Sequence, residues 1–214
     1  DTPSDTPPPA LPAAEGAAPR VRELVDAALA AGREWLTEPE AKQLLAACGV
    51  PVVPTRTVIA SPIAAVSAAT ALGFPVVLKI LAPEITHKSD VGGVMLDLGS
   101  PGEVADAATR MLERVAARRP DAHIEGFTLQ PMVRRTRALE LIAGTHIDPL
   151  FGPVILFGAG GTRVEVVADR AVGLPPLNEP LARALISRTK FARLLAGWRD
   201  VPPADAAALH GVLI

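Results

Sequence analysis

The sequence is poor in the residue types that mark several functional classes. Only 3% of its 214 residues are aromatic and none is tyrosine, so a surface that stacks nucleic-acid bases is not expected. The single cysteine, Cys48, excludes an internal disulfide and a metal site built from several cysteines. No apolar run reaches the ~18 residues that a membrane-spanning helix needs, and the N-terminus lacks a secretory signal pattern. We therefore expect a cytoplasmic protein that binds neither nucleic acid nor membrane.

The charge and the apolar content describe a folded chain with an irregular start. Basic residues number 21 and acidic residues 23, a net charge of −2 that predicts no polyanion-binding role. Apolar residues make up 49%, enough for one large or two small domains with real cores. Residues 1–19 hold six of the 22 prolines and few bulky side chains, a composition typical of a disordered linker. A linker there predicts that another domain precedes this one.

Helices and strands alternate in the first part of the chain, and strands cluster in the second. Capping residues, glycines and apolar periodicity predict helices over 21–32, 37–48, 61–73, 100–118, 178–196 and 203–213. Short apolar runs bounded by glycine or proline predict strands over 52–59, 75–79, 93–98, 127–133, 138–143, 154–157 and 164–168. This order predicts an α/β (α+β) fold whose second half is more antiparallel.

The stretch from Phe74 to Val94 carries the clearest chemical signal. An apolar run that is expected to be buried ends at Lys79. Burying an ammonium group without a partner costs several kcal/mol, so Lys79 is expected to have an anionic partner. The glycine pair Gly92 and Gly93 opens the next strand and allows backbone N–H groups to approach an anion. We expect the lysine and the glycines to converge on one polyphosphate. From the residues alone, Lys79 at a strand end that extends to water is the alternative.

These residues resemble a known family. FPVVLKI, HKSDVGGV, LQPMV, ELIAGTHIDPLFGPVILFGAGG and VEVVAD are similar to the ATP-grasp part of the ADP-forming acyl-CoA synthetases, whose best-known member is ADP-forming acetate–CoA ligase. The resemblance implies an ATP-grasp fold with a nucleotide cleft between two lobes, over 20–125 and 126–214. The family's acidic Asp-x-Asn-Pro strand, expected after the helix at 203–213, is missing, so the fold is expected to be truncated at its C-terminus and the segment alone to be inactive.

The resemblance assigns roles to the loop between the two strands. Lys79 would neutralise the nucleotide phosphates, and His87 would accept or relay a phosphoryl group with help from Lys88. Asp90 would orient His87, although an aspartate at this place also caps a turn through its own backbone. Gly92 and Gly93 would face the phosphates or form an ordinary bulge. A histidine that only hydrogen-bonds within the loop is the alternative for His87.

The resemblance also assigns a nucleotide hinge and a metal site. Gln130, Pro131, Met132 and Val133 would meet the adenine, and Glu140 would reach the ribose or a metal-bound phosphate, unless it is simply solvated. The loop FGAGGT at 157–162 departs from a dinucleotide fingerprint, because Arg163 stands at the third glycine. Beyond it, Glu165 and Asp169 would touch Mg²⁺ or pair with neighbouring arginines.

The function implied is ATP-dependent formation of an acyl-CoA from a small-molecule acid, with ADP and phosphate as products, through acyl phosphate and phosphohistidine. The cofactors would be ATP/ADP and Mg²⁺. The partner would be a CoA-binding, acyl-transferring domain or subunit, expected N-terminal in the same chain. The alternatives are a non-catalytic nucleotide-sensing module, for example fused to an N-acetyltransferase, and a succinate-type synthetase subunit.

Overall fold

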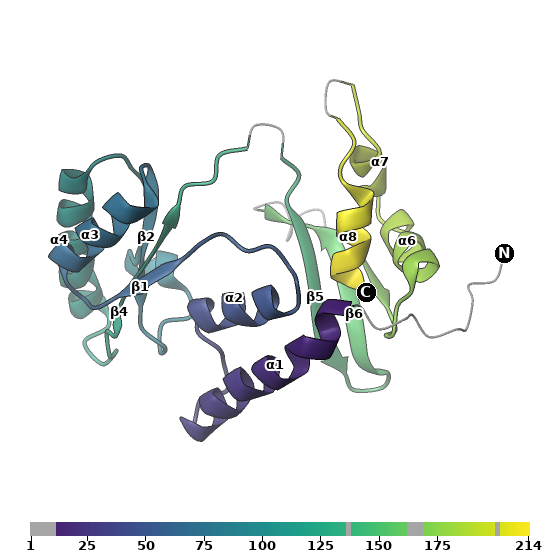
Figure 1. Cartoon of the computed structure of the whole chain (residues 1–214), viewed down its shortest axis with the longest axis horizontal. Helices are drawn as coiled ribbons and strands as arrows, with labels where there is room; N and C mark the ends of the chain where they lie inside the picture. The colour runs from purple at the N-terminus through teal and green to yellow at the C-terminus, as the bar shows by residue number, and fades with distance from the viewer. Residues whose placement is uncertain (1–11, 136–137, 162–168, 200–201) are drawn as a thin grey trace. The chain divides into compact units, whose positions relative to one another are not determined.

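The computed structural model describes residues 12–135, 138–161, 169–199 and 202–214, with side chains from residue 17 onward. Its folded part divides into two compact units, which meet in sequence between Arg134 and Arg135. The boundary expected at 125/126 would separate one strand from its sheet, because β4 (Gly126–Pro131) pairs with β1 and β2 of the first unit. Figure 1 shows the elements of both units, coloured along the chain.

The first unit is built on a four-stranded antiparallel sheet of order β1-β4-β2-β3. Its strands are β1 (Arg56–Val58), β2 (Val76–Leu81), β3 (Val94–Leu98) and β4. Its helices are α1 (Pro12–Ala30), α2 (Glu38–Ala47), α3 (Pro62–Leu72), the 3-10 helix η1 (Lys88–Val91) and α4 (Pro101–Arg118).

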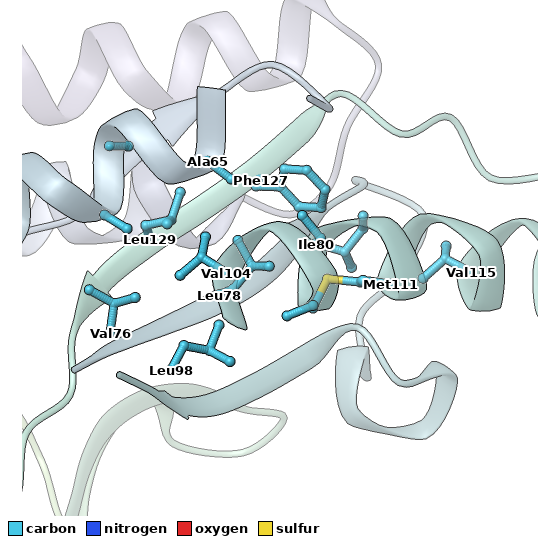
Figure 2. Packing of buried hydrophobic residues seen from close by; sticks show 14 of the residues in the cluster. Ala65, Val76, Leu78, Ile80, Leu98, Val104, Met111, Val115, Phe127 and Leu129 are labelled. Atoms are coloured by element: carbon cyan, nitrogen blue, oxygen red, sulfur yellow. The ribbon is translucent and has the colours of Figure 1, made fainter. Parts of the chain in front are cut away.

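Alternation along β2 gives the sheet two different faces. Val76, Leu78 and Ile80 are fully buried and pack with residues of α3 and α4. Figure 2 shows these side chains with Phe127 and Leu129 of β4 and with a row from α4. Each such large side chain contributes about 1.5–3 kcal/mol when fully buried. The other face carries residues 77, 79 and 81, of which Val77 and Leu81 are also buried, whereas Lys79 is partly exposed and contacts Glu38 at the start of α2.

The helix starts follow from the caps that the sequence predicts. The Thr37 backbone N–H donates to the Glu40 carboxylate at 2.7 Å, which completes the capping box at the start of α2. Ser61 accepts from the Ala64 N–H and Ser100 accepts from the Glu103 N–H, so α3 and α4 begin as predicted.

The second unit is a three-stranded antiparallel sheet of order β5-β6-β7 with helices packed on it. The strands are β5 (Leu141–Asp148), β6 (Gly152–Ala159) and β7 (Arg170–Gly173). The helices are α6 (Glu179–Ser187), α7 (Ala192–Leu195) and α8 (Ala206–Leu213). Phe157, Ala182 and Leu185 are buried at its centre.

Several predicted segments need correction. Part of the predicted linker, from Pro12 to Pro19, is helical, because alanines at four of these positions favour a helix and Pro12 occupies its first turn. The predicted strand 52–59 shrinks to β1, since Pro54 cannot donate to a sheet. The predicted helix 178–196 is divided into α6 and α7. Strand β7 was not predicted, and the strand predicted at 164–168 lies outside the described residues.

Within the described parts of the chain, no helix combines the length and the apolar character needed to cross a membrane.

Candidate functional site

Lys79 lies inside strand β2 rather than at its end. Ile80 and Leu81 continue the strand beyond it, and Lys79 pairs with Val94 of β3 and with Thr128 of β4. Its side chain is only 20% exposed, so the alternative of a lysine extending to water is not supported, and the expectation that Lys79 ends its strand is wrong. A partly buried ammonium in the middle of a sheet needs an acceptor at close range.

The acceptor is Glu38, the first residue of α2. The Lys79 ammonium donates to Glu38 Oε1 at 2.6 Å, Lys42 Nζ lies 3.1 Å from the same oxygen, and Lys88 Nζ lies 3.9 Å from Oε2. We call Glu38 and these three lysines the lysine cluster. It contains three of the four lysines in the chain, the fourth being Lys190. Three positive charges and one negative charge give the cluster a net charge of +2.

Lys42 connects the cluster to the strand predicted to be the nucleotide hinge. Its ammonium donates to Gln130 Oε1 at 2.5 Å and to the Thr55 hydroxyl at 2.7 Å. The four cluster side chains are each about one-fifth exposed. Partial burial weakens the screening of these charges by water and salt, so their attraction for an anion is stronger than that of surface lysines.

The pKa of Glu38 shows which effect dominates in the cluster. Burial by itself raises the pKa of the carboxyl, but hydrogen bonds from Lys79 and Lys42 and their positive charges outweigh it. The net effect holds the pKa of Glu38 below its ordinary value. The carboxylate is therefore ionised at neutral pH and acts as an anion bound by lysines.

Thr128 places an unpaired hydroxyl beside Lys79. The residue is 2% exposed and lies directly across from Lys79 in the β2–β4 register, and its Oγ1 has no hydrogen-bond partner among the described residues. An unsatisfied buried hydroxyl costs about 1–3 kcal/mol. The same sheet face thus holds a cationic cluster and a spare polar group.

His87 lies at the start of η1, next to Lys88 of the cluster. It is exposed, and its imidazole makes no hydrogen bond or ion pair with any described residue. Lys88 turns back from η1 toward Glu38 and so ties this loop to Lys79. The structure therefore brings together Lys79, Lys88 and Gln130, with His87 as an accessible neighbour.

Asp90 is exposed, and its backbone N–H donates to the His87 carbonyl at 3.2 Å, while its own carbonyl accepts from Arg118. These backbone contacts hold the η1 turn in place. Orientation of His87 by the Asp90 side chain stays a prediction.

Gly92 and Gly93 are used differently from the expectation. Their N–H groups donate to the carbonyls of Ser89 and Lys88 within the loop. Gly92 has φ +73°, and a Cβ on Gly93 would lie 2.6 Å from Cγ2 of Ile80, which is buried on the sheet face opposite Lys79. The glycines thus have a structural role within the loop, and Lys88, which was not part of the predicted convergence of Lys79 with the glycines, is the loop residue that approaches Glu38. A phosphate contact from the glycines stays a prediction.

A cavity of about 630 Å³ adjoins the cluster within the first unit. Glu38 and Lys88 belong to its wall, Leu81 and Ile85 supply apolar surface, and Trp35 is 76% exposed beside it. The cluster therefore has open space next to its carboxylate.

Beyond Gln130, the backbone of the predicted hinge is mostly used in pairing with strand β2 and the residue before it. Pro131 pairs with Val76, and the Met132 N–H donates to the Pro75 carbonyl at 2.9 Å. Val133 is half-exposed. The Met132 N–H is thus already used, and adenine binding along 130–133 stays a prediction.

Two of the predicted site residues of the second unit, Glu140 and Asp169, contact different parts of it. The Glu140 side chain lies against the glycine turn, because a Cβ on Gly161 would come within 2.8 Å of its Oε2, and the Glu140 carbonyl accepts from the Gly160 N–H. Asp169 instead accepts the N–H groups of Lys190 and Phe191 at 2.9 and 2.7 Å. Glu165 lies outside the described residues.

The metal assignment gains no support from the described residues, none of which form a group of three or more histidines, cysteines or carboxylates. Asp169 uses both oxygens to hold the start of α7, a role the sequence did not suggest.

Sequence reasoning missed Glu38 and Lys42. Their spacing of four residues places both side chains on one face of α2, and this pattern could have predicted that they pair with each other. The capping-box interpretation of 37–40 assigned Glu38 no role beyond the helix start.

Comparisons with known proteins identify the family of the chain. The model of the ATP-grasp domain family matches residues 27–214. The beta subunit of ADP-forming acetate–CoA ligase II from Pyrococcus furiosus is 38% identical over 192 residues, which cover 90% of this chain and 80% of that protein. The 4-hydroxybutyrate–CoA ligase (ADP-forming) of Nitrosopumilus maritimus is 36% identical over 89% of this chain, but over only 27% of its own length.

Solved structures show the same fold. Acetyl-coenzyme A synthetase 1 of Ca. Korarchaeum cryptofilum, in complex with coenzyme A and Ca-AMPCP, superposes with a TM-score of 0.84 at 40% identity, covering 90% of this chain and 83% of that chain. The same enzyme with Mg-AMPPCP has its phosphohistidine segment pointing towards the nucleotide binding site and superposes with a TM-score of 0.76, at 36% identity, over 91% and 82% of the two chains. The family match over most of the chain confirms the resemblance seen in the sequence. This chain belongs to the ATP-grasp domain family, in the form found in the ADP-forming acetate–CoA ligases.

Proposed function

We propose that this chain binds ATP or ADP and transfers its phosphoryl group within an ADP-forming acyl-CoA synthetase. The observation that carries the proposal is the convergence of Lys42, Lys79 and Lys88 on one carboxylate, with the exposed His87 next to Lys88 in the sequence. A partly buried cluster with a net charge of +2 suits a polyphosphate, because each ammonium can form a charge-assisted hydrogen bond to a phosphate oxygen.

Phosphoryl transfer would then depend on position and charge neutralisation. Lys79 and Lys42 would hold phosphate oxygens over the sheet, and Lys88 would hold those of the group in transit. The nitrogen of neutral His87 would attack the γ-phosphorus of ATP; the bond to the bridging oxygen breaks, and ADP leaves. The phosphoryl group would pass from His87 to a carboxylate oxygen of the acid, which frees the imidazole. The CoA thiol would then attack the carbonyl carbon of the resulting acyl phosphate, and phosphate would leave as acyl-CoA forms.

The similar proteins are the basis for proposing a partner and a metal ion. Two similar proteins from Pyrococcus furiosus are beta subunits, and the similar Korarchaeum enzyme was solved with coenzyme A and with Mg-AMPPCP. We therefore propose a CoA-binding, acyl-transferring partner subunit or domain, and Mg²⁺ that arrives bound to the nucleotide phosphates.

The first test measures nucleotide affinity by calorimetry. Lys79→Ala should weaken ADP binding about 10- to 100-fold, because a hydrogen bond to a charged group contributes about 1.5–3 kcal/mol. Lys190→Ala is the matched control, since Lys190 is the one lysine outside the cluster and is exposed. Equal affinities for the two variants would refute the phosphate-binding role of the cluster.

The second test follows ³²P from γ-labelled ATP onto the protein. Acid-labile label is expected on the wild-type chain when it is assayed together with its CoA-binding partner domain or subunit, and it should vanish in His87→Ala while persisting in His123→Ala, an exposed histidine of the same unit. Label that survives in His87→Ala, or a wild-type chain that binds ATP and never takes up label, would contradict transfer to His87. The latter result would favour a module that binds nucleotide without transferring phosphate.

A further inference from the structure

Glu38 occupies the place that an anion would take in the lysine cluster. Its Oε1 is 2.6 Å from Lys79 Nζ and 3.1 Å from Lys42 Nζ, and its Oε2 is 3.9 Å from Lys88 Nζ. A phosphate bound by the same lysines would share their ammonium groups with this carboxylate and would lie next to its negative charge. We propose that Glu38 is an internal competitor, a carboxylate that the nucleotide phosphates must displace from Lys79 and Lys88; this inference rests on the phosphate-binding function proposed above.

Electrostatics makes the competition unavoidable. A phosphate oxygen held by Lys79 would lie about 4.5 Å from the bound Glu38 oxygen if the carboxylate stayed, since two acceptors of one tetrahedral ammonium are each ~2.8 Å from the nitrogen. Like charges at that distance repel, and the site is only partly exposed, so screening is incomplete. Glu38 thus lowers the affinity for any phosphate, and a chain with several negative charges displaces it more readily than a single phosphate does.

The structure provides both the space and the freedom for this exchange. Glu38 lines the cavity of about 630 Å³, so its side chain has somewhere to go. The start of α2 is capped by Thr37 and Glu40, and Glu38 takes no part in that cap. Moving the Glu38 carboxylate therefore breaks its lysine contacts and leaves the helix start intact.

A purely supporting role for Glu38 predicts the opposite sign. If the carboxylate served only to position Lys79, its removal would release the ammonium and weaken phosphate binding. If it competes, removal raises the cluster from +2 to +3 and strengthens phosphate binding. The direction of the change therefore separates the two roles.

The test uses the whole chain with ADP, inorganic tripolyphosphate and adenosine as separate calorimetric probes. Glu38→Gln should bind ADP and tripolyphosphate about tenfold more tightly than the wild type, the effect of one unit charge at ~6 Å in an effective dielectric of about 40. Adenosine, which carries no phosphate, should bind with unchanged affinity. Glu38→Ala should show the same gain without relying on the geometry of the amide.

Glu34→Gln is the matched control. Glu34 lines the same cavity and carries the same charge, but it makes no contact with the lysines of the described structure. It should change tripolyphosphate affinity less than twofold. A thermal melt of each variant confirms that the fold is retained.

The outcomes separate this inference from the proposed function. If Lys79→Ala fails to weaken ADP binding, the phosphate site itself is wrong. If Lys79→Ala weakens binding while both Glu38 variants match the wild type or bind more weakly, the phosphate site stands and the competitor role is refuted. A gain for adenosine equal to that for ADP would also refute it, because the change would not concern phosphate.

Discussion

Glu40 holds together the start of the helix that carries the cluster, and its removal gives a quantitative prediction. Its carboxylate accepts two hydrogen bonds from the Arg33 guanidinium, at 2.7 and 2.8 Å, and two more from the backbone N–H and hydroxyl of Thr37. The Arg33 hydrogen bonds are the main reason that the pKa of Glu40 falls from 4.5 to about 2. The perturbation is Glu40→Gln, which keeps the shape and removes the charge.

The lowered pKa of Glu40 gives the sign and the size of the expected change in unfolding free energy. A carboxyl with a depressed folded-state pKa stabilises the protein above its unfolded pKa near 4.5, and this contribution disappears as the pH falls through about 2. A shift of this size is worth at most about 3.4 kcal/mol at neutral pH. Because the Glu40 side chain is 24% exposed, we expect about 2–3 kcal/mol after screening.

The assay is urea unfolding of the whole chain at several pH values. The fluorescence of Trp35 follows unfolding near Arg33 and Glu40, because the Trp35 carbonyl accepts a hydrogen bond from Arg33. A Trp198→Phe background removes the fluorescence of the other tryptophan. Wild type should exceed Glu40→Gln in unfolding free energy by about 2–3 kcal/mol at pH 7, and the gap should narrow to about 1 kcal/mol at pH 3. A gap that stays constant from pH 7 to pH 3 would refute the argument.

Three further substitutions test other contacts by thermal or urea unfolding. Thr128→Val should raise the unfolding free energy by about 1 kcal/mol, because the buried hydroxyl is unpaired; a loss would mean that the hydroxyl has a partner. Gly93→Ala should cost about 1–3 kcal/mol through overpacking against Ile80, and an unchanged midpoint would show that the loop adjusts freely. Asp169→Asn should cost about 1–2 kcal/mol, since an amide keeps one acceptor for the two N–H groups at 190–191; no loss would argue against the capping role.

The sequence predicted local features well, because their causes are local. The capping residues marked the helix starts, since Ser61 and Ser100 accept from N–H groups three residues on and the Thr37 N–H donates to the side chain of Glu40. Composition was a poorer guide at the N-terminus, where prolines disfavour a helix and alanines favour one. The N-terminal part of α1 was therefore predicted to be linker.

The site was predicted less completely, because it depends on contacts between distant residues. Lys79 was recognised as a buried cation, but its partner Glu38 lies 41 residues away on α2, and nothing local links the two. Gly92 and Gly93 were expected to face a phosphate, which stays a prediction, and a Cβ on them would come close to Arg114 and Ile80 respectively, a tertiary constraint that the sequence does not show. Asp169 likewise holds residues more than 20 positions away.

The most direct measurement of the central claim is the reactivity of the four lysines toward an amine-specific acetylating reagent, followed by mass spectrometry with and without ADP. Lys42, Lys79 and Lys88 should all be protected when ADP is bound, because their ammonium groups would hold phosphate oxygens. Lys190 should react at the same rate in both conditions. Equal reactivity of Lys79 and Lys88 with and without saturating ADP would contradict the assignment of the cluster as the phosphate-binding site.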